Sequence, residues 1–67
     1  MQTVGWAVVE NESEPVLLVE ERGSRVIQYP GGAKLFAECD DLPHFLSKLT
    51  AQGFVVIRSG TGRPDDL

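Results

Sequence analysis

The stretch DDLPHFLSKLTAQG, residues 40–53, is the one segment of this 67-residue chain with a helical apolar period. Its large apolar side chains recur at i, i+3, i+4 and i+7, so they share one face of a helix. These side chains are Leu42, Phe45, Leu46 and Leu49. The rest of the chain reads as strand or turn, and this helix must therefore cover the sheet that the other residues build.

Both ends of the predicted helix carry boundary signals. Either Asp40 or Asp41 can accept a hydrogen bond from a free N–H of the first turn. Pro43 falls in that first turn, where its missing N–H costs nothing. Gly53 suits a left-handed cap at the C-terminal end. The sequence therefore predicts one helix within residues 40–53.

Segments rich in β-branched and other apolar residues predict five strands, at residues 3–10, 16–21, 25–29, 34–39 and 54–59. The turns between the middle strands are short, since Gly23 accepts a positive φ and Pro30 followed by Gly31 suits a tight turn. The predicted fold is α+β, in the order β-β-β-β-α-β: a four-stranded antiparallel meander, one helix and a final strand, forming a two-layer sandwich. Residues 1–59 form the single domain, and residues 60–67 are expected to be a flexible C-terminal tail.

Charge and composition argue against several classes of protein. The chain has 10 acidic and 6 basic residues, a formal net charge of −4, whereas nucleic-acid binders normally carry a basic face. The single cysteine, Cys39, excludes an internal disulfide, and no His, Cys and carboxylate group has metal-ligand spacing. The N-terminus does not read as a signal peptide, and no apolar run has the length of a membrane span. We expect a cytoplasmic protein without a cofactor or a membrane partner.

One helix is too narrow for the predicted sheet. A helix of about 12 residues is roughly 18 Å long and 10 Å wide, whereas five strands spaced about 4.8 Å apart exceed 20 Å. A sheet covered on one side should alternate apolar and polar residues, but stretches such as residues 16–19 (VLLV) are apolar on both faces. The face away from the helix is therefore expected to be an apolar patch, which usually marks an interaction site.

Two arrangements would bury that face. The chain can self-associate, sheet on sheet or edge to edge, as a two-fold homodimer. Alternatively, the strands can close into a small five-stranded barrel with the helix at one end. We favour the homodimer. Large amphipathic rings are enriched at binding hot spots, so Trp6 and Tyr29 are the expected anchors if their strands place them on the open face. The candidate interaction residues are Trp6, Val8, Leu17, Val19 and Tyr29.

One compact set of reactive side chains lies just before and within the helix. A thiol and an imidazole can form a nucleophile–base pair or contribute to a metal site, but the chain has only one Cys and one His. We interpret Cys39 as a small buried residue, Asp40 and Asp41 as helix caps and His44 as a polar first-turn residue. No catalytic, metal-binding or cofactor-binding residue is predicted.

Charged residues gather around the predicted hairpins. The acidic ones can form a surface for a basic partner, or imitate the charge of nucleic acid, or simply protect the strand edges. They are Glu10, Glu12, Glu14, Glu20 and Glu21. The basic residues Arg22, Arg25 and Lys34 can form a small phosphate-binding patch. The order of three strands followed by a helix resembles, in topology only, the arm-type DNA-binding domains of tyrosine recombinases, which are basic.

The sequence favours a small non-enzymatic protein–protein interaction module. Such a regulator, adaptor or inhibitor, in the manner of phage or mobile-element accessory proteins, would act through its apolar sheet face as a homodimer. The alternative is a regulatory protein that binds or mimics nucleic acid.

Overall fold

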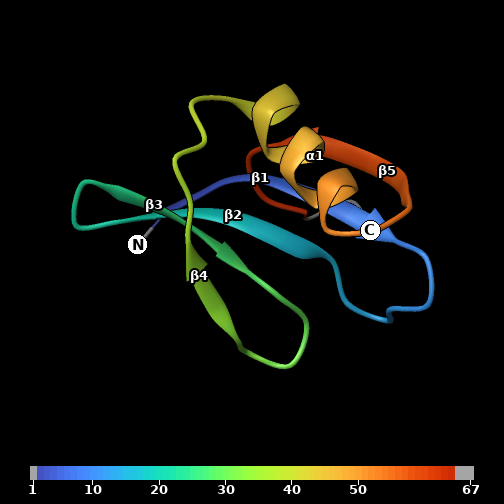
Figure 1. Cartoon of the computed structure of the whole chain (residues 1–67). Helices are drawn as coiled ribbons and strands as arrows, with labels where there is room; N and C mark the ends of the chain where they lie inside the picture. The colour runs from blue at the N-terminus through green and yellow to red at the C-terminus, as the bar shows by residue number, and fades with distance from the viewer. Residues whose placement is uncertain (1, 65–67) are drawn as a thin grey trace.

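The computed structural model describes residues 2–64, which form one antiparallel sheet with one helix packed on it (Figure 1). The strands and the helix follow the predicted order. They are β1 (Gln2–Val9), β2 (Val16–Glu21), β3 (Ser24–Gln28), β4 (Lys34–Phe36), α1 (Leu42–Ala51) and β5 (Val56–Thr61). The prediction of an α+β fold with a meander, a helix and a final strand is confirmed.

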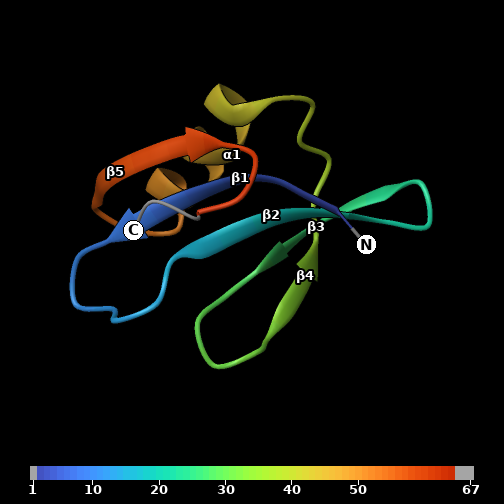
Figure 2. The same ribbon diagram turned by 180° about the vertical axis from the view of Figure 1, so that it is seen from behind.

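The sheet has the strand order β4-β3-β2-β1-β5. The first four strands form the meander, and the chain then crosses one face through α1 and adds β5 beside β1 at the opposite edge. Seen from behind, the sheet lies in front of the helix (Figure 2). Within the described residues, β4 and β5 each pair with only one neighbour, so the sheet is open. The alternative of a closed barrel is wrong, because the two edge strands do not meet.

Both ends of α1 are capped by the residues that the sequence indicated. The Asp41 side chain accepts a hydrogen bond from the His44 N–H at 3.0 Å. At the other end Gly53 has a φ of 97°, its N–H donates to the Thr50 carbonyl, and the Phe54 N–H donates to the Leu49 carbonyl. This pair of bonds is a Schellman motif, which satisfies carbonyls that the helix leaves free.

The turns explain the tight meander. Arg22 and Gly23 both have positive φ, 52° and 80°, as the two-residue hairpin between β2 and β3 requires. In the next turn the Gly32 N–H donates to the Tyr29 carbonyl at 3.1 Å, and Gly31 has a φ of 92°. Both turns therefore depend on a glycine that adopts a positive φ.

Strand boundaries differ from the prediction at the two edges. β4 ends at Phe36 rather than at residue 39, because the chain leaves the sheet to bury Cys39 beneath the helix. β5 begins at Val56 and runs to Thr61, so residues 60 and 61, predicted as tail, extend the strand opposite β1. The last three residues of the predicted tail, 65–67, lie outside the described part of the chain.

The hydrophobic core lies between α1 and the sheet. Phe45 and Leu49 of the helix are fully buried against β1, β2 and β3. The core residues are Ala7, Val9, Val16, Leu18, Ile27, Cys39, Phe45 and Leu49. The side chains that alternate with these along the strands must point to the opposite, open face of the sheet.

Candidate functional site: the open face and edges of the sheet

Four of the predicted interaction residues lie on the open face, and three of them are partly accessible. Trp6 and Val8 alternate with core residues on β1, and Leu17 does so on β2. Trp6 pairs directly with Leu17 in the β1–β2 register. All three side chains are half-buried, although they are not part of the core under α1. They therefore form a shallow apolar surface over β1 and β2, on the side of the sheet away from α1, which is turned to the viewer in Figure 2.

Trp6 is held flat against the neighbouring strand. It pairs with Gly60 of β5, and a Cβ added at Gly60 would lie 2.6 Å from Cζ2 of the indole. The guanidinium carbon of Arg58 lies 6.0 Å from the ring centroid, at the outer limit of a cation–π contact. Gly60 and Arg58 are thus part of the Trp6 environment. The sequence analysis missed both, because it placed Gly60 in the tail and did not predict which strand lies beside β1.

Val19, the fourth predicted residue, is on this face but is fully buried. It pairs with Val26 of β3, which is also buried. Lys34 Nζ donates to Glu21 Oε1 at 2.8 Å. Lys34 on β4 is paired with the β3 residue two positions after Val26, and Glu21 on β2 is paired with the β3 residue two positions before it. The ion pair therefore crosses β3 above Val26. The valine pair is therefore covered by the chain's own charged side chains and is not available for contact.

The Lys34–Glu21 pair also has an electrostatic consequence. The hydrogen bond from Lys34 lowers the pKa of the Glu21 carboxyl below its usual value. The carboxylate therefore stays ionised at a lower pH than an ordinary glutamate would, so the ion pair over Val26 persists further into acid.

Tyr29, the fifth predicted residue, lies on the other side of the sheet. Its hydroxyl donates to Gln52 Oε1 at 2.6 Å, and its ring stacks on Phe54 with centroids 5.9 Å apart. Tyr29 shares the helix side with Ile27, two residues earlier, because side chains alternate along a strand. Trp6 and Tyr29 therefore lie on opposite sides of the sheet. The prediction required both anchors to be on the open face, and only Trp6 is.

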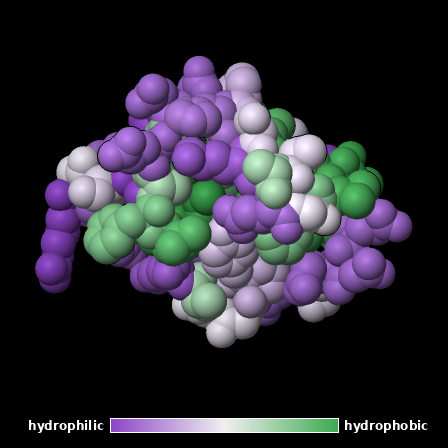
Figure 3. All heavy atoms as spheres, in the orientation of Figure 1, coloured by the Kyte–Doolittle hydropathy of each residue, from purple (hydrophilic) through white to green (hydrophobic). Residues whose placement is uncertain are grey.

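The most exposed large apolar side chains are at the edges rather than in the middle of the open face. Their exposed fractions range from 52% to 80%. They are Leu35 and Phe36 on β4, Val55 just before β5, and Ile57 near its start. Figure 3 shows the corresponding hydrophobic areas on opposite sides of the molecule, one over β4 and one where β5 begins. The uninterrupted apolar run of residues 54–57 was the sequence signal for the second area.

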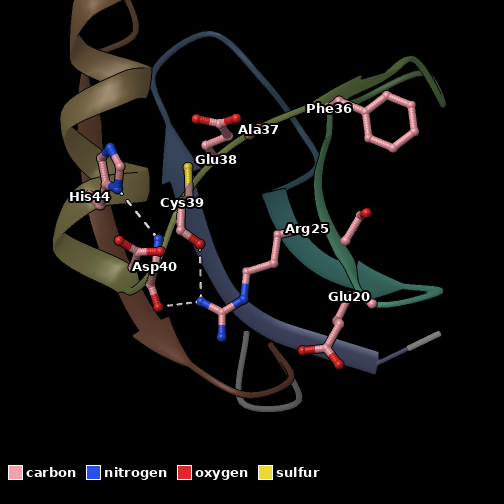
Figure 4. A pocket seen from close by; sticks show the side chains of 10 residues that line it. Glu20, Arg25, Phe36, Ala37, Glu38, Cys39, Asp40 and His44 are labelled. Carbon is pink, nitrogen blue, oxygen red and sulfur yellow. Dashed lines mark hydrogen bonds between the residues drawn. The ribbon is translucent and has the colours of Figure 1, made fainter.

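The reactive set around the start of α1 has structural partners. Cys39 is 3% exposed and belongs to the core, and burial raises the pKa of its thiol. Since the thiolate is the nucleophile, this environment disfavours reaction. Arg25 donates from its guanidinium to the carbonyls of Cys39 and Asp40 and so fixes the linker before the helix (Figure 4). His44 is exposed and accepts a weak bond from the Asp40 N–H at 3.4 Å.

Other charged residues are distributed unevenly. Of the three basic residues near the hairpins, Arg25 and Lys34 are engaged as described, and Arg22 is exposed on its turn. Glu10, Glu12 and Glu14 are exposed at the end of β1 and in the loop that follows it. Between residues 2 and 64, no three His, Cys, Asp or Glu side chains gather closely enough to hold a metal ion.

The comparisons with known proteins identify no relative: no family model matches this chain, and no curated protein or solved structure matches it significantly. Among the described residues, no helix has the length and apolar character needed to cross a membrane.

Proposed function

We propose that this chain is a small, non-enzymatic protein–protein interaction module of the cytoplasm, a regulator, adaptor or inhibitor that works as a homodimer. The observation that carries the proposal is the position of Trp6. Its indole lies on the face opposite α1, beside Val8 and Leu17, and no helix or strand of the described chain covers it.

The chemistry of the surface supports a protein partner. A half-buried tryptophan held in place by packing loses little conformational freedom on binding, which is why such rings dominate interface energetics. Gly60 beside the ring and the Arg58 guanidinium over its face keep the indole in one orientation. A nucleic-acid partner has less support, because Arg25 and Lys34 already bind groups of the chain itself.

Affinity capture with matched baits tests the role of the open face. The chain, its Trp6→Asp variant and its Leu35→Asp variant are each immobilised and exposed to extract from cells that encode the protein. Proteins retained by the wild-type and Leu35→Asp baits should be lost from the Trp6→Asp bait, because only Trp6 lies on the open face. Leu35 is the matched control: an exposed apolar residue paired with Ile27 on the helix side.

The helix signal in circular dichroism must be equal for the three baits. If the Trp6→Asp bait retains the same proteins as the wild type, the open face is not the binding surface. Equal loss from both variant baits would also contradict the proposal, because a substitution on the helix side should be neutral.

A further inference from the structure

The end of the described chain turns back toward the open face. β5 finishes at Thr61, and the Gly62 N–H donates to the Val4 carbonyl of β1 at 2.8 Å. The chain bends at Gly62, whose φ of 73° is one that residues with a side chain rarely adopt. In Figure 2 the segment after this bend returns toward β1 on the side of the sheet away from α1. Pro64 is half-buried, so the returning chain lies against the body of the protein.

The length of β5 gives the reach of the residues that follow. At about 3.3 Å per residue, Arg58 lies roughly 13 Å from Gly62 along the strand. A chain that reverses at Gly62 needs about four residues to return over that distance, which brings residue 64 level with Gly60 and residue 66 level with Arg58. Gly60 and Arg58 are the β5 residues that border the Trp6 indole. Residues 65–67 are therefore long enough to reach the Trp6 surface.

The chemistry around Arg58 matches that of this segment. Arg58 is exposed on the open face and pairs with Val8 in the β1 register, and no carboxylate of the described residues forms an ion pair with it. The other basic residue of the open face, Lys34, is already bonded to Glu21. Residues 65–67 are Asp-Asp-Leu, two carboxylates followed by an apolar side chain. Both parts of the segment therefore find a complement, one in the guanidinium and one in the valine beside it.

We propose that residues 65–67 fold back onto the open face and cover the Trp6 indole. Their carboxylates bind the Arg58 guanidinium, and Leu67 packs beside Val8. The covalent link favours this occupant over a separate molecule of similar chemistry, because a tethered segment is present at a high effective concentration. Ordering three residues costs conformational entropy, so the cover is weak enough for a partner to displace. The inference rests on the proposed function: the Trp6 surface is the binding site, and this segment competes for it.

Acrylamide quenching of fluorescence tests the cover, because Trp6 is the one tryptophan of the chain. The double variant Asp65→Asn, Asp66→Asn removes both carboxylates and keeps the whole chain. The docked fraction should fall by about two- to fivefold, the range that an exposed ion pair supports, and the quenching constant of Trp6 should rise. Glu12→Gln with Glu14→Gln makes the same charge change in the loop after β1 and should leave quenching unchanged. An equal rise in both double variants would contradict the proposal, since net charge alone would then explain it.

A double-mutant cycle identifies the group that the carboxylates bind. Arg58→Gln alone should raise the quenching constant, because it frees the segment and uncovers one face of the indole. In the Asp65→Asn, Asp66→Asn background the same substitution should have a smaller effect, because the segment is already released. Additive effects would overturn the proposal. Raising the salt concentration should move the wild type toward the double variant, because salt screens exposed charges and acrylamide is uncharged.

The outcomes separate this inference from the proposed function. Quenching that changes neither with the two asparagine substitutions nor when the chain is ended after Pro64 overturns the cover, but the Trp6 capture experiment still stands. A higher quenching constant in both of these variants supports the cover, whatever the baits retain. Retention of the same proteins by the Trp6→Asp bait contradicts the proposed function and leaves the quenching result intact. Circular dichroism checks that every variant folds.

Discussion

At the scale of single residues, Trp6 and Gly60 depend on each other. The indole occupies the space that a side chain at position 60 would fill, and the ring carbons Cζ2 and Cε2 would lie 2.6 and 2.8 Å from an added Cβ. Cβ contacts this short do not persist, so either the ring or β5 must move. The flat position of Trp6 on the open face therefore requires glycine at its partner position.

Gly60→Ala should displace the indole and lower the free energy of unfolding by about 1 kcal/mol, the lower end of overpacking costs because the ring is half-exposed and can swing outward. The emission of Trp6 should shift to longer wavelength as the ring enters water. In a Trp6→Ala background the same glycine substitution should be neutral or stabilising. An equal cost with and without the indole would show that the contact is not its cause.

Burial separates residues that look equivalent in the sequence. Trp6 and Tyr29 were expected as a pair of anchors, but one lies on the open face and the other packs against Phe54 on the helix side. Cys39 lies in the core, as the sequence indicated for a small apolar residue. The sequence was sufficient to predict that Cys39 is buried, because a free cysteine behaves as a small apolar residue with only a weak hydrogen-bond donor.

At the scale of strands and helix, an ion pair links β2 to β4 across β3. The Lys34 and Glu21 side chains meet above Val26, and their aliphatic parts shield a valine that would otherwise lie on the open face. This is why the predicted apolar face is smaller than the strand sequences suggested.

The stability contributed by this pair should depend on pH. Because the Glu21 pKa is lowered in the folded chain, its contribution is present above the ordinary carboxyl pKa and is lost as the pH falls through the lowered value. Glu21→Gln should therefore be less stable than the wild type at pH 7 and equally stable in strong acid, as measured by urea denaturation at a series of pH values. Glu20→Gln, an exposed neighbour whose side chain faces the helix side, is the control. A constant difference across all pH values would mean that charge is not involved.

The helix is the element that the sequence predicted best. Its apolar period, the aspartate before it and Gly53 after it are all contained within residues 40–53, and each feature is used in the structure. β2 likewise has the predicted bounds, Val16–Glu21. The bounds of the edge strands were predicted less well. An edge strand ends where its backbone hydrogen bonds to its one neighbouring strand end, and its own sequence does not set that position.

At the scale of the whole molecule, a chain of this length has a small core under a single helix. Domains of this size bury only about 60% of their unfolded surface, so association can supply a substantial part of their stability. The two apolar edges, at opposite sides of the molecule (Figure 3), carry the large apolar side chains that the fold leaves most exposed.

The melting temperature should rise with protein concentration, because a dimer that dissociates on unfolding is stabilised by mass action. Over a hundredfold range of concentration the wild type should show a steady rise. Differential scanning fluorimetry or calorimetry is sufficient for this comparison. A melting temperature independent of concentration for the wild type would contradict dimerisation in that range.

The sequence by itself determined the helix, the turns, the strand count and the α+β class of this protein. These features depend on contacts between residues a few positions apart, which a linear pattern records directly. Only the tertiary structure decided the strand order, the side of the sheet on which Tyr29 lies and the burial of Val19 under the Lys34–Glu21 pair. Those outcomes depend on which distant strands pair and in which register, and a sequence in which both faces of the strands are apolar does not distinguish between the possible partners.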